Sequence, residues 1–469
     1  MSSIKSKNTN VIKKVLGNKT VIVSIFFTLL MVVIFHIIAT IPTPGITVSE
    51  DAANGTGFSS MLNLLAGGGL NRMSIFSVGV GPYITAQIII QLLSSDLIPP
   101  LSRMAKGGER GKKKLEVITR MIALPFCVAQ AYAVVMLLLK ESDGNITVFG
   151  KTDVNELSAA NIITLIAIFT GGTYLAIFIG DMITKRGVGN GMTLLILSGI
   201  VSSVVSNFQI AFQVIGGNFQ QATTANTVGY ILSVMLYISI FILLLFACIF
   251  VNDSVRKIPI QQTGQGLINE TKDLPFLPIK LNASGVIPVI FASSLMTIPT
   301  TIAQFLSEEN SGRIFIDSYL QVETPVGLVI YFVLIILFSF FYSYVQINPM
   351  NLAENFQKSG KFIPGVKSGL DTEKHITRVL MRVNCLGAPF LAIVAALPYV
   401  ISIITKIPSG LALGGTGLII IVTGSLDLWN SIESNSTASG YSVDRVKIEN
   451  KVYEKESVSD KSGDGYKLW

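Results

Sequence analysis

Long apolar runs recur along the whole chain, and each is separated from the next by a polar, turn-rich or charged loop. A helix needs about 20 predominantly apolar residues to cross the hydrocarbon core of a bilayer. We predict ten membrane-spanning helices, at residues 20–40, 73–93, 117–139, 159–179, 190–208, 228–250, 285–305, 325–344, 379–397 and 415–428. The pattern therefore predicts an all-α, polytopic membrane protein.

The stretch 57–95 departs from a simple alternation of spans and loops. It opens with an amphipathic segment, 58–70, in which Phe58, Leu62 and Leu65 precede the glycine triplet of Gly67, Gly68 and Gly69. At about 1.5 Å per residue this segment would cover about 20 Å, less than the core of about 30 Å. The span that follows contains several polar residues. A half-helix beside a polar span indicates a water-filled or movable cavity, because irregular backbone at membrane depth needs protein or water partners.

The amino-acid composition supports a membrane protein, and the sequence offers few residues of the types that catalytic sites use. Half of the 469 residues are hydrophobic, 13% are charged, and the mean hydropathy is +0.61, which excludes an ordinary soluble domain. The sequence contains no G-x-S-x-G, H-E-x-x-H or Walker A motif, and its two histidines are His36 and His375. We therefore predict no enzymatic activity, no catalytic residue, no metal site and no cofactor.

The charges of the loops predict the topology, because cytoplasmic loops of membrane proteins carry an excess of Lys and Arg. Five lysines precede the first span, whereas residues 41–57 after it contain Glu50 and Asp51 and no basic residue. Basic and acidic or uncharged loops then alternate along the chain. With ten spans, this pattern places both termini in the cytoplasm.

Two of the predicted cytoplasmic loops, 252–284 and 346–377, are longer than a connection requires. Both combine Pro-Gly turns and basic residues with apolar residues that we expect to be exposed, namely Ile258, Ile260, Phe362 and Ile363. Such loops are typical of a docking surface for a soluble partner. The alternative is a solvated loop whose positive charge only determines topology. The tail 431–469 is polar and mixed in charge.

Several long motifs occur in a fixed order. They are IPTPGI at 41–46, MLNLLAGGGLNRMSIFSVGVGPYITAQIIIQLL at 61–93, RGVGNGMTLLI at 186–196, NASGVIPVIFASS at 282–294, NPMNLAENFQKSGKFIPG at 348–365 and GGTGLII at 414–420. By these motifs the chain resembles the bacterial SecY family (SecY/Sec61α), the central subunit of the Sec protein-conducting channel, up to about residue 433.

The resemblance implies a polytopic protein of ten transmembrane helices in two inverted five-helix halves, 20–208 and 228–430, joined by an external connection at 209–227. The short tail 1–19 and the tail 431–469 would lie in the cytoplasm, and segment 58–70 would be a plug half-helix. The inverted repeat itself is not visible in the sequence.

The resemblance also implies three sets of functional residues. The pore ring would be formed by aliphatic side chains that resist wetting, and the matching positions are Val80, Ile84, Met192, Ile196, Ile290 and Ile420. A lateral gate would be held by weak buried hydrogen bonds, and its matching positions are Thr85, Gln130 and Asn282. The docking positions for a motor or ribosome are Arg256, Lys257 and Lys367. Lys367 stands where the family usually has arginine, so its charge is kept but the bidentate donor fork is lost.

The function implied is a passive, gated channel that carries unfolded secretory proteins across the bacterial plasma membrane and releases transmembrane segments into lipid. The implied partners are SecE-like and SecG-like membrane subunits, a SecA-like motor ATPase, the ribosome, and signal sequences. From the residues alone, a secondary transporter of inverted-repeat type is the alternative. It would usually place ionisable groups near the midplane, where these spans have very few.

Overall fold

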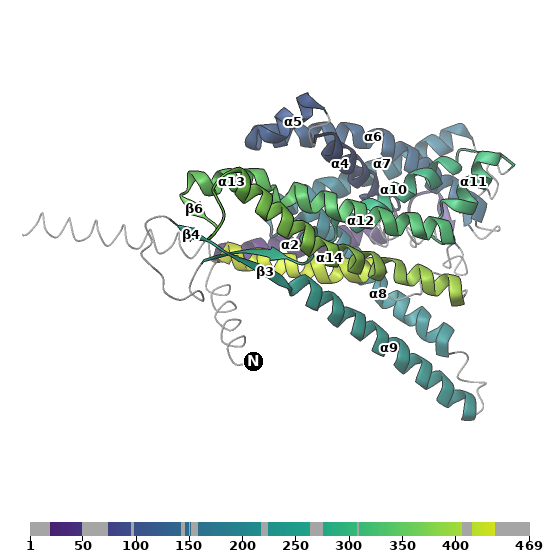
Figure 1. Ribbon diagram of the computed structural model, residues 1–469. Helices are drawn as coiled ribbons and strands as arrows, with labels where there is room; N and C mark the ends of the chain where they lie inside the picture. Colours follow the sequence, from purple (N-terminus) through teal and green to yellow (C-terminus); the bar gives the residue numbers. More distant parts are fainter. Residues whose placement is uncertain are drawn as a thin grey trace, which may run out of the picture.

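The computed structural model describes residues 19–48, 74–94, 98–141, 146–149, 151, 158–216, 224–262, 275–306, 309–405 and 415–436. Helices dominate this part of the chain and run side by side as a bundle (Figure 1). The predicted plug, 58–70, lies outside the described residues, as do 437–469 of the predicted tail.

Each predicted span corresponds to a helix. These are α2 (Lys19–Thr40), α4 (Gly81–Ser94), α6 (Gly108–Glu141), α7 (Ala159–Arg186), α8 (Gly191–Gly216), α9 (Thr224–Asp253), α10 (Ile287–Ala303), α12 (Pro325–Ile347), α14 (Leu370–Thr405) and a helix at 415–436. Among the described residues, six helices are long and apolar enough to cross a bilayer, or seven if α4 and the bent-away α5 (Pro99–Lys106) form one span. The other three spans are α8, α10 and helix 415–436. Two short helices, α11 (Ser311–Tyr319) and α13 (Pro349–Lys358), flank α12.

The second span begins later than its apolar pattern predicts. Residues 74–80 form turns, and the helix begins only at Gly81, so the prediction of a helix from residue 73 is wrong. Serine side chains account for the difference, since they offer the backbone an alternative to helical hydrogen bonds. Phe76 N donates to Ser74 Oγ at 3.2 Å, and Ser77 Oγ donates to Ser74 O at 2.5 Å.

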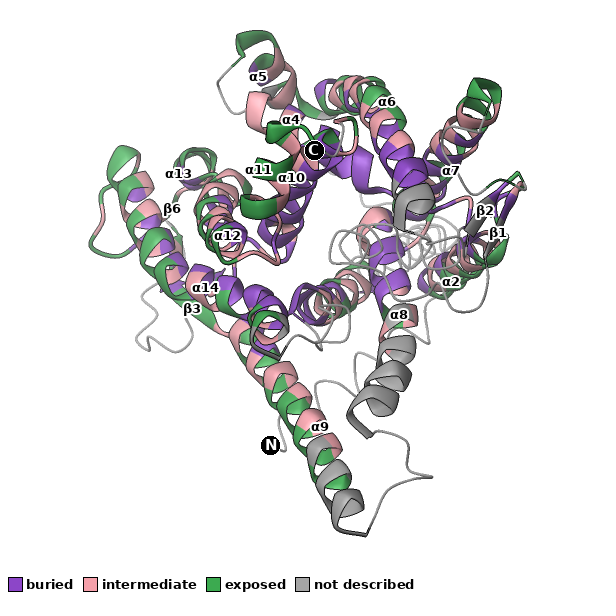
Figure 2. Ribbon diagram, turned by 90° about the vertical axis from the view of Figure 1, so that its right-hand side faces the viewer, coloured by how far each residue is buried: buried purple, intermediate pink, exposed green. Residues whose placement is uncertain are grey.

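The helices pack as two groups. In the first group, α6 contacts α4 and α7, and α2 contacts α7 and α8; in the second, α12 contacts α10 and α14. The groups meet where α10 contacts α4 and α6, and again where α8 contacts α9. Figure 2 shows α2, α6, α7 and α8 on one side of the bundle and α12 and α14 on the other, with the long α9 projecting from it.

The described residues form three short two-stranded sheets, of which two connect loops that are distant in sequence and one lies within a single loop. They pair β1 (Ile46–Val48) with β2 (Ile146–Val148), β3 (Val255–Pro259) with β5 (Phe276–Lys280), and β4 (Gln261–Gln262) with β6 (Lys361–Phe362). The first sheet joins two loops predicted to be external, and the last joins the two long loops predicted to be cytoplasmic. These two sheets therefore pair loops that were predicted to lie on the same side of the membrane.

The two long loops share a core, which we name the loop cluster. Its buried members are Ile258, Ile260, Ile279, Phe356, Ile363, Ile376 and Leu380. The expectation that Ile258, Ile260 and Ile363 are exposed is wrong, and Phe362 is half-buried. The pairing of β4 with β6 explains this, because it places both loops over α13 and the start of α14, where their apolar side chains exclude water.

We expect Ile376→Ala to destabilise this region, because Ile376 is completely buried in the loop cluster. Removing its side chain leaves a cavity and costs about 2–5 kcal/mol of unfolding free energy. The thermal unfolding of the detergent-extracted protein measures this, with Leu370→Ala as control because Leu370 is 74% exposed. Equal effects of the two substitutions would contradict the cluster.

Candidate pore and gate

The six predicted ring residues come together from four elements. Val80 and Ile84 lie at the start of α4, Met192 and Ile196 on α8, Ile290 on α10 and Ile420 on helix 415–436. Five of them are members of one large buried apolar cluster, and the partly buried Met192 packs against it. Val80 precedes the first residue of α4, but Ile84 N donates to its carbonyl at 3.1 Å, so the two side chains keep the spacing of one helical turn.

Met192 differs from the other five in its direction. A β-carbon added at Gly180 would stand 2.7 Å from Met192 Sδ, so the thioether lies against α7. Met192 also packs on a second cluster, which includes Tyr83 and Ile177. Its side chain therefore fills space between helices of the first group as well as bordering the central cluster.

Two side-chain contacts close the boundary where the helix groups meet at α10. The ring of Tyr132 on α6 stacks on that of Phe305, just beyond α10, with centroids 4.6 Å apart and planes inclined by 19°. The side chains of Gln91 on α4 and Tyr342 on α12 share a hydrogen bond. Both contacts lie beside the places where α10 contacts α4 and α6.

The three predicted gate residues are all buried, but the structure shows no hydrogen bond among them. Thr85 Oγ1 donates to Gly81 O of its own helix at 3.1 Å. Gln130 Oε1 accepts no hydrogen bond from any described residue. Asn282 Nδ2 donates to Asn252 Oδ1 at 2.9 Å, at the end of α9. Asn282 is therefore tied to the second helix group and not across the boundary.

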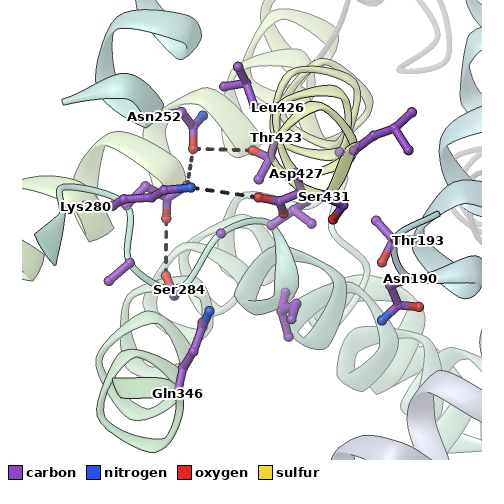
Figure 3. Close-up of a pocket in the computed structure, with 18 of the residues that line it drawn as sticks. Asn190, Thr193, Asn252, Lys280, Ser284, Gln346, Thr423, Leu426, Asp427 and Ser431 are labelled. Atoms are coloured by element: carbon purple, nitrogen blue, oxygen red, sulfur yellow. Dashed lines mark hydrogen bonds and ion pairs between the residues drawn. The ribbon is translucent and has the colours of Figure 1, made fainter. Parts of the chain in front are cut away.

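A polar cavity of about 310 Å³ opens between the two groups, at the end of the bundle that carries β3 to β6 (Figure 3). Its lining includes Asn190 and Thr193 from the first group, and Lys280 and Asp427 from the second. Lys280 Nζ lies 3.9 Å from an Asp427 carboxylate oxygen. Val286 and Ile287 form its apolar side, and Ile290 follows one helical turn later. The cavity thus ends about one helical turn from Ile290, one of the predicted ring residues.

The comparisons with known proteins agree with this architecture. The model of the SecY family matches residues 74–429. A protein translocase subunit SecY of Mycoplasmoides gallisepticum is 50% identical over 466 residues, which cover 98% of this chain and 92% of that protein. The chain belongs to the SecY family.

Two solved structures show that the fold is shared with distant proteins. One, described as a protein conducting channel, has a TM-score of 0.62 at 18% identity, over 88% of this chain and 92% of that one. The other, Sec61 in the canine ribosome-channel complex from the endoplasmic reticulum, has a TM-score of 0.58 at 16% identity, with the same coverages. This SecY-family chain is thus a multi-pass membrane protein with the fold of known channels.

The predicted docking residues are exposed on the surface around the loop cluster. Arg256 and Lys257 lie on β3, and the ammonium of Lys257 stands 4.7 Å from the centre of the Phe276 ring. Lys367 lies in the second loop, and its carbonyl accepts a hydrogen bond of 2.9 Å from Thr372 Oγ1. The sheet of β4 and β6 holds the two loops that carry these cations together.

Sequence reasoning missed an ion pair inside the first helix group. The guanidinium of Arg120 on α6 pairs with Asp181 on α7, and Tyr174 Oη donates to Arg120 O at 2.7 Å. Opposite charges close to apolar spans were the available signal, since such charges are usually paired. The pair joins α6 to α7 within the first group of this SecY-family protein.

Adjacent glycines on α7 give a matched test of how residues 74–80 are positioned. A β-carbon at Gly172 would meet Ile75 O at 2.1 Å, whereas one at Gly171 would meet nothing within 4 Å. We expect Gly172→Ala to displace the segment that leads to Val80 and to lower stability by roughly 1–3 kcal/mol. Gly171→Ala should leave thermal stability unchanged or slightly raised. A loss of stability in the Gly171 variant equal to that at Gly172 would contradict this packing.

Proposed function

We propose that this chain is the protein-conducting subunit of a Sec translocon, a passive gated channel through which unfolded secretory proteins cross the plasma membrane. The observation that carries the proposal is the meeting of aliphatic residues from four elements and both helix groups in one buried cluster. A polar cavity stands at its entrance. Apolar constrictions exclude water and ions, while flexible side chains can move aside for a polypeptide.

The lateral gate lies where α10 meets α4 and α6. Its contacts are the Tyr132–Phe305 stack and the Gln91–Tyr342 hydrogen bond. Interhelical hydrogen bonds in membranes contribute only about 0.6 kcal/mol on average. Burial of an apolar signal sequence or transmembrane segment between the groups can therefore compensate for their loss. This supports release of such segments into lipid through the same boundary.

The exposed cations around the loop cluster form the docking surface. A translating ribosome is a suitable partner for this surface. The phosphates of ribosomal RNA attract Arg256, Lys257 and Lys367 whatever the RNA sequence is. A SecA-like motor is the second partner of this surface, and SecE-like and SecG-like subunits cover the membrane-facing helices. Excess positive charge supports a cytoplasmic location for this surface and for both termini. The amphipathic segment 58–70 acts as the plug on the opposite side.

Site-specific crosslinking tests the channel. Photoreactive probes at Ile84, Ile196 and Ile290 should form adducts with a stalled secretory precursor in membranes, and only when the precursor has a signal sequence and a ribosome or motor is present. A probe at Ile393 on α14, which is 55% exposed, is the control and should react with lipid. If no ring position reacts while another translocon in the same membranes carries the precursor, the transporter alternative replaces the channel.

The ring also predicts an ion-leak phenotype. Ile290→Ser places a hydroxyl in the apolar constriction, so we expect it to hydrate the ring and raise the ion conductance of the idle channel in planar bilayers. Ile393→Ser, which changes an exposed position on the outer surface, should leave the conductance unchanged. If the Ile290 variant is expressed and folded normally and its ion conductance is unchanged, Ile290 does not form part of the constriction that excludes ions.

A further inference from the structure

A single turn joins the docking hairpin to the gate helix. The hairpin of β3 and β5 carries Arg256 and Lys257, and all five residues of β3 pair with β5. Leu281 N donates to Ser254 O at 2.8 Å, which extends the ladder beyond β5. After residues 281–286 the chain enters α10, which contacts α4 and α6 at the gate. The hairpin and α10 are therefore separated by only six residues.

Buried hydrogen bonds hold this turn firmly to α9 and helix 415–436. Asn252 near the end of α9 is the centre of these bonds. Its Oδ1 accepts from Asn282 Nδ2 at 2.9 Å. The same oxygen accepts from Thr423 Oγ1 at 3.5 Å, and Figure 3 shows this second bond. Its own Nδ2 donates to Cys248 O at 3.0 Å. Asn252, Asn282 and Thr423 are each at most 8% exposed, so water does not compete strongly for these bonds.

The turn is also fixed from the side of α12 and α14. Ser284 Oγ lies 3.3 Å from Asn282 Oδ1 and 3.0 Å from Ser339 Oγ on α12. A β-carbon at Gly387 would stand 2.3 Å from Leu281 O, so α14 touches the turn with its backbone. A turn held on several sides cannot absorb a displacement by flexing. It passes the displacement on to the elements that it joins.

We propose that Asn252 is a positioning residue that couples the docking hairpin to the gate: through Asn282 it fixes the 281–286 turn, so that displacement of the hairpin by a docked partner moves α10. This inference rests on the proposed channel and docking functions and adds the path between them. Asn252 is not one of the ring residues, the gate contacts or the exposed docking residues. It lines the polar cavity, but its side-chain oxygen is engaged by Asn282 and Thr423, so we assign it a positioning role.

The gate contact at Tyr132 and Phe305 reports the movement of α10. In a chain whose three cysteines are replaced by alanine, Tyr132→Cys with Phe305→Cys allows the rate of oxidant-induced disulfide formation to be measured. Ribosomes without a nascent chain serve as the probe, so that docking is separated from insertion of a signal sequence. We expect docking to slow disulfide formation in this parent, because α10 moves away from α6.

Adding Asn252→Ala should reduce the effect of ribosomes on the disulfide rate by at least about fivefold, the lower end of common coupling strengths. Ribosome affinity, measured by co-sedimentation, should not change. Asn252→Asp keeps the acceptor oxygen for Asn282 and Thr423 and should restore the response. Asn252→Leu, which leaves no cavity, replaces the alanine variant if that one does not fold.

Ser343→Ala is the matched control. Ser343 is as deeply buried as the network and donates to Asn384 Oδ1 at 3.1 Å. Its hydrogen bond joins α12 to α14 and is linked to the turn only indirectly, through Asn384, Ser339 and Ser284. It should keep the full response. The coupling is overturned if Asn252→Ala responds like the parent, if Ser343→Ala loses the response equally, or if the parent does not respond to ribosomes. Precursor crosslinking at the ring would still decide the channel function separately.

Discussion

Backbone that leaves the helical conformation inside a membrane protein must find its hydrogen bonds within the protein, and this constraint governs the two segments on which the pore depends. Residues 74–80 and 281–286 both interrupt the helical pattern, and each leads into a helix that carries ring residues. In the first segment Ser74 and Ser77 satisfy the backbone; in the second Asn252 and Asn282 hold the turn. Residues 74–80 precede α4, the second spanning helix of the first half, and residues 281–286 precede α10, the second spanning helix of the second half. This correspondence is expected if the two halves have the same design.

The division into rigid groups and a weak boundary follows from how each contact is made. Within the first group, the Arg120–Asp181 pair joins α6 to α7. Gly191 at the start of α8 lies so close to α7 that a β-carbon there would meet Gly180 O. Within the second, Ser339, Ser343 and Asn384 join α12 to α14. Across the proposed gate, the contacts of the described residues include an aromatic stack and a side-chain hydrogen bond. On the proposed function, we therefore expect movement at the boundary between the groups.

Apolar periodicity predicted the existence of all ten helices, because each must bury or present a long apolar surface whatever its neighbours are. It could not predict that α4 begins at Gly81, since the competing hydrogen bonds of Ser74 and Ser77 depend on local geometry. The burial of Ile258 and Ile363 depends on pairing between loops about 100 residues apart. Likewise, the family motif placed Asn282 at the gate, but only the fold shows that Asn252 is its partner.

The pairing of β4 with β6 is only two residues long, yet it changes what the two loops can offer a partner. Free loops would each lose conformational entropy when a large complex docks, and that loss would weaken the association. Because the sheet and the loop cluster order the described parts of both loops during folding, this conformational entropy is lost before a partner binds. The loops then act as one preorganised platform, so a partner that needs both can bind in a single step and dissociate without leaving a disordered surface behind.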